Sequence, residues 1–386
     1  MTRKDNKKRT KLPLRLVQLT AALGLLAIVA FIFLLFAERD RPDGPGPGQG
    51  SVVDNRTPEP VRAVETPAPQ GSITITSRDA SDAQPIRGAA FEIVDLASSA
   101  VVDTLVTDEE GRATSKPLDY GTRAAVRQLR VSAAYAPLDE ERIVEIAAPN
   151  QDVVTENRLR DYVQETKRND EGELEITKVY LDVATLMQKP ELPNGCEITS
   201  LTAVLNFYGY DADKLDMADN YLPKEPWNRK NGKLFGADPY KAYAGDPRDQ
   251  PGGFFSYAPP IVAAADRYLG ERDASGLAAR DISGSTREEL LEHLYGGTPV
   301  VVWTTLDMSP PKVTYSWYFH DTGELFKAPV NLHVLVLNGY DAGTNTVHVM
   351  NPLEGQVTYN ADTFFKSYEE MGSHALVVER ADSAAR

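Results

Sequence analysis

Residues 188–209 read QKPELPNGCEITSLTAVLNFYG and contain the single cysteine of this 386-residue chain. Apolar residues recur at helical spacing over 198–208, and Gly209 is a natural helix terminator. A proline and a glycine interrupt regular structure just upstream, so we expect Cys196 at or beside the first turn of the helix. Unpaired backbone N–H groups and the helix dipole favour a thiolate there. The alternative is a structural cysteine packed under the helix start.

Residues 332–352 read LHVLVLNGYDAGTNTVHVMNP and predict a β-hairpin. If residues 341–343 form the loop, His333 directly faces Asn351. Directly opposed side chains have Cβ atoms about 4.5–5.5 Å apart, which lets an asparagine carbonyl hold one imidazole nitrogen. The remaining histidines lie on a polar helix face, in turn-like surroundings, or on a strand with little chemistry around it; they are His293, His320, His374 and His348.

A cysteine on a helix N-terminus, a histidine on a strand and an asparagine, in that chain order, form the papain-type arrangement. In this interpretation Cys196 attacks a carbonyl, His333 accepts its proton and later passes it to the leaving group, and Asn351 fixes the imidazole tautomer. The oxyanion needs donors, which we expect from the backbone N–H of Cys196 and the side-chain amide of Gln188.

The amino-acid composition excludes several classes of protein. A 42% hydrophobic content excludes fibrous and fully disordered classes. The formal net charge of −15 divides into +6 for residues 1–15 and −21 for the rest. So acidic a body repels phosphate backbones, which argues against nucleic-acid binding. A single cysteine cannot form an internal disulfide.

Residues 16–37 carry no charge and are long enough to span a hydrocarbon core of about 30 Å as a helix. We expect an uncleaved transmembrane anchor, because a signal peptide, the alternative, has a shorter apolar core and a small-residue cleavage site. The basic segment 1–15 then lies in the cytoplasm, and everything from residue 38 onward is extracytoplasmic. Residues 38–70 are rich in proline and glycine and predict an extended linker.

Short apolar runs alternate with turn signals over 71–148, which predicts an all-β, antiparallel sandwich. The segments GSITIT (71–76), IRGAAFEI (86–93), VTDEEGRA (106–113) and LDYG (118–121) resemble the prealbumin-like repeat domains of Gram-positive pilins and adhesins. Many members carry a lysine for an internal isopeptide bond at the end of the first strand, where this chain has Ser77. The resemblance therefore implies a spacer that does not cross-link itself.

Residues 149–173 are highly charged and are interpreted as a connector, and 174–381 as an enzyme domain with an α+β fold. Its opening resembles the bacteriocin-processing-peptidase-like cysteine peptidases of the papain clan. The same subfamily matches GADPY, YAGDP, YAPPI, GTPVVVW, HVLVLNGY and NPLEG in order, from residue 236 to 355. Two positions depart from its pattern: Asn351 stands where aspartate is usual, and Ser256 where a second thiol is often found.

These features predict a membrane-anchored thiol hydrolase that cleaves a peptide or isopeptide bond of a peptide or protein substrate at the cell surface. Transfer of the acyl group to an amine would use the same residues. The rival interpretation is a surface adhesin or scaffold whose hydrolase fold has lost catalysis. No phosphate-binding loop, zinc-ligand spacing or dinucleotide fingerprint occurs, so we expect neither cofactor nor metal.

Overall fold

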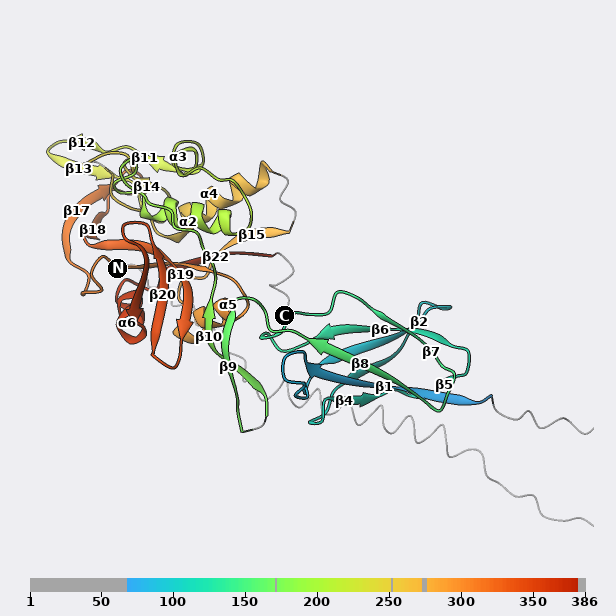
Figure 1. Cartoon of the computed structure of the whole chain (residues 1–386). Coiled ribbons are helices and arrows are strands. Elements are labelled where there is room, and N and C mark those ends of the chain that lie inside the picture. The colour runs from blue at the N-terminus through green and yellow to red at the C-terminus, as the bar shows by residue number, and fades with distance from the viewer. Residues whose placement is uncertain (1–67, 171, 251–252, 273–275, 381–386) are drawn as a thin grey trace, which may run out of the picture. The chain divides into compact units, whose positions relative to one another are not determined.

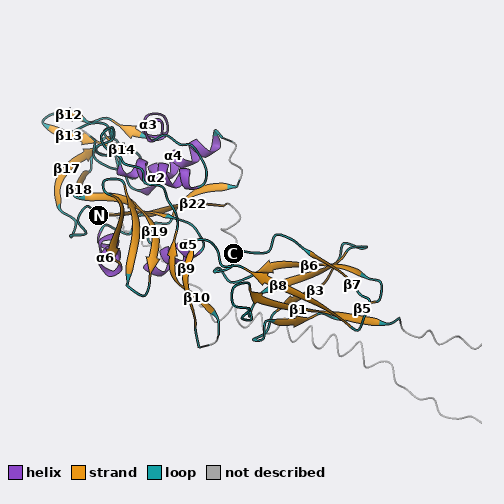
Figure 2. Ribbon diagram, in the orientation of Figure 1, coloured by secondary structure: helices purple, strands orange, loops and turns teal. Residues whose placement is uncertain are grey.

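The computed structural model describes residues 68–170, 172–250, 253–272 and 276–380. Two separate hydrophobic cores lie within them, one among residues 73–153 and the other among residues 179–378. The chain therefore contains an N-terminal β domain and a larger C-terminal domain with mixed secondary structure (Figures 1 and 2). The expected anchor at 16–37 and linker at 38–70 lie outside or almost outside the described residues. Within those residues, no helix is long and apolar enough to cross a membrane.

The N-terminal domain is a β-sandwich of two four-stranded sheets. One sheet contains β1 (Gln70–Asp79), β4 (Arg112–Thr114), β5 (Leu118–Asp119) and β8 (Asn150–Asn157). The other contains β3 (Val101–Val106), β2 (Ala90–Asp95), β6 (Arg123–Arg130) and β7 (Arg142–Glu145). Every second residue of β1 is buried, as expected of a strand with one face on a core.

The sandwich differs from the expected one at its C-terminal end. Strand β8 pairs in parallel with β1, so the domain is not purely antiparallel and includes residues assigned to the connector. The inward side chains of β8 are Val153, Thr155 and Asn157, and two of these are polar, which explains why no apolar alternation was visible. Ser77 faces Thr155 in this register, and both hydroxyls are buried without a hydrogen-bond partner.

The rest of the expected connector also has regular structure. Strand β9 (Val163–Arg168) pairs antiparallel with β10 (Leu174–Tyr180), and both belong to the sheet of the C-terminal domain. The exposed charged residues Glu165, Lys167 and Arg168 of β9 are typical of an edge strand, in which charged side chains discourage pairing with other chains. Interpreting 149–173 as a charged connector was therefore wrong in its local structure.

A central sheet forms the frame of the C-terminal domain, in the order β15-β22-β16-β19-β10-β9, with β20 and β21 continuing from β19. The strands are β15 (Leu277–Asp281), β22 (Ala375–Arg380), β16 (Val300–Thr305), β19 (Leu332–Asp341), β20 (Thr346–Asn351) and β21 (Gly355–Asn360). Figure 1 shows helices on both sides of this sheet: α2 (Cys196–Phe207) and α4 (Ala258–Gly270) on one, α5 (Arg287–Tyr295) and α6 (Ala361–Glu370) on the other.

The expected helix after the cysteine is confirmed as α2. It ends at the Tyr208 cap, and Gly209 follows with φ +89°, a conformation that glycine adopts without strain. All residues from Cys196 to Leu205 are buried, because α2 packs against β16 and β19. The helix that carries the cysteine is therefore fixed in the core.

Residues 220–260 are rich in Pro, Gly, Tyr and Trp with little periodicity, which predicts a long surface excursion; in the structure residues 228–233 are exposed, whereas residues 242–245 are buried. The segment contains β11 (Lys224–Glu225), β12 (Asn228–Lys230), β13 (Lys233–Gly236) and β14 (Tyr243–Ala244). Strands β12 and β13 join β17 (Val313–Phe319) and β18 (Leu325–Pro329) in a second sheet. Aromatic rings of Trp227, Phe254 and Trp317 pack edge to face there, which holds part of a segment that has no apolar periodicity against the core.

The β19–β20 hairpin forms with a different register from the expected one. Tyr340 pairs with Val347, whereas a three-residue loop would have placed it opposite Thr344. The turn is longer, and a bulge lies between the Leu337 and Gly339 pairings. His333 and Asn351 are consequently not directly opposed in the ladder.

Candidate active site

Cys196 is the first residue of α2 and is almost fully buried, with 8% of its surface exposed. Gly195 precedes it as the N-cap and provides no side-chain hydrogen bond to the helix. A Cβ atom on Gly195 would lie 2.7 Å from Cβ of Leu192, so the close turn before the cysteine requires glycine. The position at the helix start agrees with the sequence prediction.

The thiol, however, does not have the environment that was expected. Its Sγ donates to Oε2 of Glu197 at 3.3 Å. Burial, followed by the negative charge of Glu197, raises the pKa of the Cys196 thiol well above its usual value. In this arrangement the resting cysteine is therefore a thiol, and the helix N-terminus does not by itself make it a thiolate.

His333 lies near the start of β19 and pairs with Thr304 of β16. Its ring is buried, and burial lowers the pKa of His333 to about 4, while the hydrogen bond to Asn351 acts in the opposite direction. The imidazole is therefore neutral at physiological pH. A neutral ring has one nitrogen free to accept a proton, as a general base requires.

Asn351, at the end of β20, determines which ring nitrogen of His333 is free to accept a proton. Its Oδ1 lies 2.8 Å from Nε2 of His333 and also accepts from the backbone N–H of Leu353. Its Nδ2 donates to Glu354 and to the hydroxyl of Tyr359, so the amide orientation is determined by its partners. An amide oxygen can only accept, hence Nε2 carries the proton and Nδ1 carries the lone pair.

Gln188 is brought to the same site, but its amide is engaged differently from the prediction. Nε2 donates to the backbone carbonyls of Leu192 and Pro193, at 3.2 and 2.8 Å. Its Oε1 is buried without a hydrogen-bond partner. Donation to an oxyanion by Gln188 would therefore require the amide to exchange these partners.

A cavity of about 240 Å³ joins these residues. Gln188, Cys196 and His333 line it, and its other walls come from the loop before α2, the segment before α4 and the β18–β19 turn. The apolar lining residues are Pro193, Phe254, Phe255, Leu306, Pro329, Val330, Leu332 and Leu353. Among the described residues that line it, Lys189 alone carries a full charge. The site therefore offers an apolar cleft beside the nucleophile.

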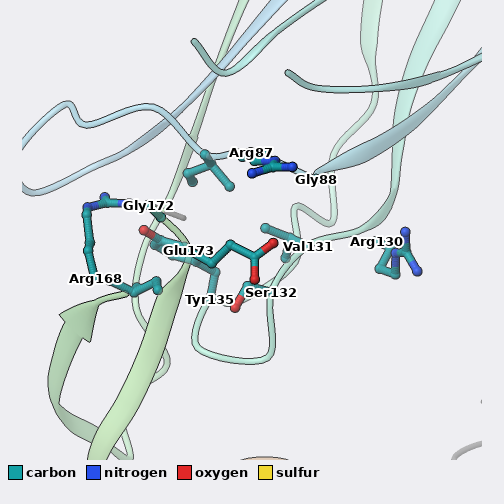
Figure 3. Close-up of a pocket in the computed structure, with 11 residues that line it drawn as sticks. Arg87, Gly88, Arg130, Val131, Ser132, Tyr135, Arg168, Gly172 and Glu173 are labelled. Atoms are coloured by element: carbon teal, nitrogen blue, oxygen red, sulfur yellow. Dashed lines mark hydrogen bonds between the residues drawn. The ribbon is translucent and has the colours of Figure 1, made fainter. Parts of the chain in front are cut away.

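A second cavity of similar size, about 250 Å³, has a different character. Arginine side chains from Arg87, Arg130 and Arg168 line it together with Glu173, as Figure 3 shows. Among the described residues that line it there is neither a cysteine nor a histidine.

The other histidines lie apart from the nucleophile. His293 lies 3.6 Å from Glu379, His320 bonds to the carbonyl of Pro226, and His348 packs against Tyr180. His374 was expected in a polar turn, but it is buried against the ring of Tyr257. In the described ranges, no group of three or more His, Cys, Asp or Glu side chains could hold a metal ion.

The sequence interpretation missed Glu197. An acidic residue in the first turn of a helix is commonplace because it complements the helix dipole, so nothing in the sequence marked it as part of a site. The structure buries it, with 1% of its surface exposed, against the cysteine.

Comparison with known proteins agrees with this architecture. Residues 180–376 match the Peptidase_C39 like family, and residues 71–162 match the prealbumin-like fold domain. The family match covers more than half of the chain, and the chain belongs to the Peptidase_C39 like family.

The chain is also similar to individual known proteins. The uncharacterized protein YvpB of Bacillus subtilis (strain 168) is 29% identical over 245 residues, which are 61% of this chain and 92% of that protein. A crystal structure of a C39-like peptidase from Bacillus anthracis is 28% identical, with a TM-score of 0.46 over 52% of this chain and 96% of that one. The T6 backbone pilin of Streptococcus pyogenes is 23% identical, with a TM-score of 0.19 over 20% of this chain and 16% of the pilin.

Proposed function

We propose that this protein is an extracytoplasmic thiol hydrolase that cleaves a peptide or isopeptide bond through a thioester at Cys196. The observation that carries the proposal is the convergence of three side chains. Cys196 and His333 line one cavity, and Asn351 holds the imidazole so that its lone pair is on Nδ1. Family membership supports a peptidase-type domain.

The reaction proceeds in two steps. The proton of Cys196 passes to Nδ1 of His333, and Sγ forms a bond to the carbonyl carbon. The tetrahedral intermediate collapses, the C–N bond breaks, and the imidazolium gives its proton to the leaving amine. Water then attacks the thioester and gives a proton to His333; the C–S bond breaks, the carboxylic acid product leaves, and the proton returns to Sγ of Cys196. The backbone N–H of Cys196, at the helix start, is the donor that we assign to the developing oxyanion.

The cavity favours substrates with an apolar side chain next to the scissile bond. Leu306 and Val330 line it while 47% and 45% of their surfaces are exposed, and such apolar exposure beside a nucleophile suits a binding cleft. The substrate that we propose is a peptide or protein segment. An amine acceptor in place of water would make the enzyme a transpeptidase with the same residues.

We also propose that residues 16–37 anchor the chain in the membrane, with residues 38–70 and the sandwich as a spacer. The uncharged length of the first segment and the proline and glycine content of the second support this placement.

The proposal is tested with an epoxide thiol trap on the full chain in detergent. Mass spectrometry should find the adduct on Cys196, formed at least about tenfold faster than on free cysteine, and His333→Ala should abolish the difference. The matched control is His320→Ala, which removes a histidine that contacts Pro226 and should leave the rate unchanged. Equal labelling of the wild-type protein and His333→Ala would refute the proposal.

A further inference from the structure

One buried group has no role in the scheme above, although it touches the nucleophile. Glu197 lies beside Cys196 in the first turn of α2, and its side chain is excluded from solvent. Oε2 accepts the thiol hydrogen at 3.3 Å, and Oε1 accepts the backbone N–H of Ser256 at 3.0 Å. A buried carboxylate without a cation beside it is costly, so its place next to the reactive sulfur calls for an explanation.

The surroundings of Glu197 come from three elements. On α2 its titratable neighbour is Cys196, and on the segment before α4 it is bounded by Ser256, whose hydroxyl is buried without a hydrogen-bond partner. On β14, Tyr243 is buried, and the charges of Glu197 and Cys196 add to the burial that raises its pKa. Tyr243 donates its own hydroxyl hydrogen to the carbonyl of Asn194. His333 of β19, which lines the same cavity as Cys196, is neutral.

The thiol and the carboxyl group share one hydrogen bond and can hold its proton in two ways. Either Sγ keeps the proton and Oε2 is an anion, or Oε2 takes the proton and Sγ is the anion. One proton moves along the contact, and no other bond changes. Both groups ionised together would place two negative charges about 3.3 Å apart in a buried site, which is strongly unfavourable.

We propose that Glu197 controls the nucleophile of this site: the Cys196 thiolate forms only while Glu197 carries a proton, and the ionised carboxylate holds the cysteine as an unreactive thiol. Protonated Glu197 donates its O–H to the sulfur anion and stabilises it. Since burial raises the pKa of Glu197 to about 7, protonated and ionised Glu197 are both present near neutral pH. The inference rests on the proposed function for its catalytic meaning, but its chemistry concerns the thiol alone.

The two states predict a distinctive pH profile for alkylation of Cys196 by iodoacetamide. Below about pH 7, Glu197 is protonated, and the rate rises about tenfold per pH unit as the thiol loses its proton to solvent. Above about pH 7, the pair retains one proton, so the thiolate fraction no longer depends on pH and the rate becomes constant. This plateau lies well below the pH at which the buried thiol would titrate alone.

The test compares the full-length protein with Glu197→Gln. The amide cannot ionise, so the alkylation rate of the variant should keep rising with pH and exceed that of the wild-type protein about tenfold at about pH 8. The matched control is Glu191→Gln, which removes an exposed carboxylate from the segment before α2 and should leave the plateau in place. If Glu197→Gln gives the wild-type profile within twofold, the inference is wrong.

A second measurement needs no substitution at Glu197. In the wild-type protein, infrared spectroscopy can follow the carbonyl band of the protonated carboxyl group before and after alkylation. Alkylation removes the S–H donor that lowers the pKa of Glu197, so the alkylated protein should lose this band at a higher pH. An unchanged titration would overturn the inference. Neither experiment requires a substrate. If the protein cleaved no peptide, the proposed function would be refuted, but the measured control of Cys196 by Glu197 would still stand.

Discussion

Nε2 of His333 lies 2.8 Å from Oδ1 of Asn351, although the two residues are not directly opposed in the hairpin that carries them. The ladder pairs Val336 with Met350, so Asn351 reaches back along β19 toward the ring. Its oxygen also accepts from Leu353, which fixes the amide beside the imidazole. The orientation of the general base therefore depends on the turn after β20 as much as on the strands.

Replacing Asn351 should distinguish its role in orienting the His333 ring from the effect of a charge beside that ring. Asn351→Ala removes the acceptor of the Nε2 proton, which frees both tautomers, and should slow epoxide labelling of Cys196 about 10- to 100-fold, the equivalent of one lost buried hydrogen bond. Asn351→Asp keeps an acceptor and adds a negative charge, which favours the imidazolium and raises the pKa of His333. Its labelling rate should stay within about tenfold of wild type. Equal rates for Asn351→Ala and wild type would contradict this role.

The pH dependence of stability should report on Glu197. Its pKa is raised from 4.5 to about 7 in the folded protein, so the folded state binds more protons than the unfolded state in this interval. The contribution of Glu197 is complete below pH 4.5 and is lost as the pH rises through about 7. Relative to wild type, Glu197→Gln should therefore become progressively more stable over that interval.

Denaturant unfolding followed by tryptophan fluorescence can measure this difference. All three tryptophans, Trp227, Trp303 and Trp317, lie in the C-terminal domain, so the signal reports on that domain. His333 acts in the opposite direction, because its lowered pKa makes stability fall as the pH drops from 6.5 toward about 4. The comparison of Glu197→Gln with wild type cancels that contribution. Parallel stability curves would show that Glu197 titrates normally.

The exposed apolar residues that line the cavity should determine substrate binding. Leu306→Ser removes apolar surface from the cavity and should raise KM for a peptide with an apolar side chain about fivefold, equivalent to roughly 1 kcal/mol, with little change in kcat. Leu325→Ser is the matched control, because Leu325 is equally exposed on β18 and does not line the cavity. A similar change in KM for both variants would show that the apolar residues lining the cavity do not determine substrate binding.

The turn before α2 should not accept a side chain. In Gly195→Ala the added Cβ would meet Cβ of Leu192 at 2.7 Å, and relief of this contact shifts the helix start. We expect a loss of about 1–3 kcal/mol in the free energy of unfolding and slower labelling of Cys196. Gly270→Ala, where nothing lies within 4 Å of the added atom, should be neutral or slightly stabilising. Unchanged labelling in Gly195→Ala would mean that the turn does not position the thiol.

The sequence predicted correctly those helices and strands that have strong apolar periodicity or a clear terminating residue. The helix after Cys196 ends beside Gly209 as predicted, and the apolar run beginning at His333 is a strand. Two expectations failed for physical reasons: β8 buries polar side chains, and Trp227 packs edge to face against Trp317 in a contact that leaves no repeat in the sequence. The contact between His333 and Asn351 was predicted from a register that does not occur.

The finer features of the site depended on tertiary contacts. The partners of Gln188 Nε2 are backbone carbonyls of a turn, which no residue pattern encodes. Glu197 reads as an ordinary helix-start residue until its burial against Cys196 is seen. The residues that line the apolar cleft come from separate loops, so they could not be assigned together in advance.

The most direct test of the central claim is to trap the acyl-enzyme. The full-length protein is mixed rapidly with an activated ester, such as p-nitrophenyl acetate, and the adduct is located by mass spectrometry. The account predicts a burst of one p-nitrophenol per protein, with the acyl group on Cys196, and neither burst nor adduct in His333→Ala. An equal adduct in His333→Ala, or acylation elsewhere in the chain, would contradict the assignment of Cys196 and His333 as nucleophile and base.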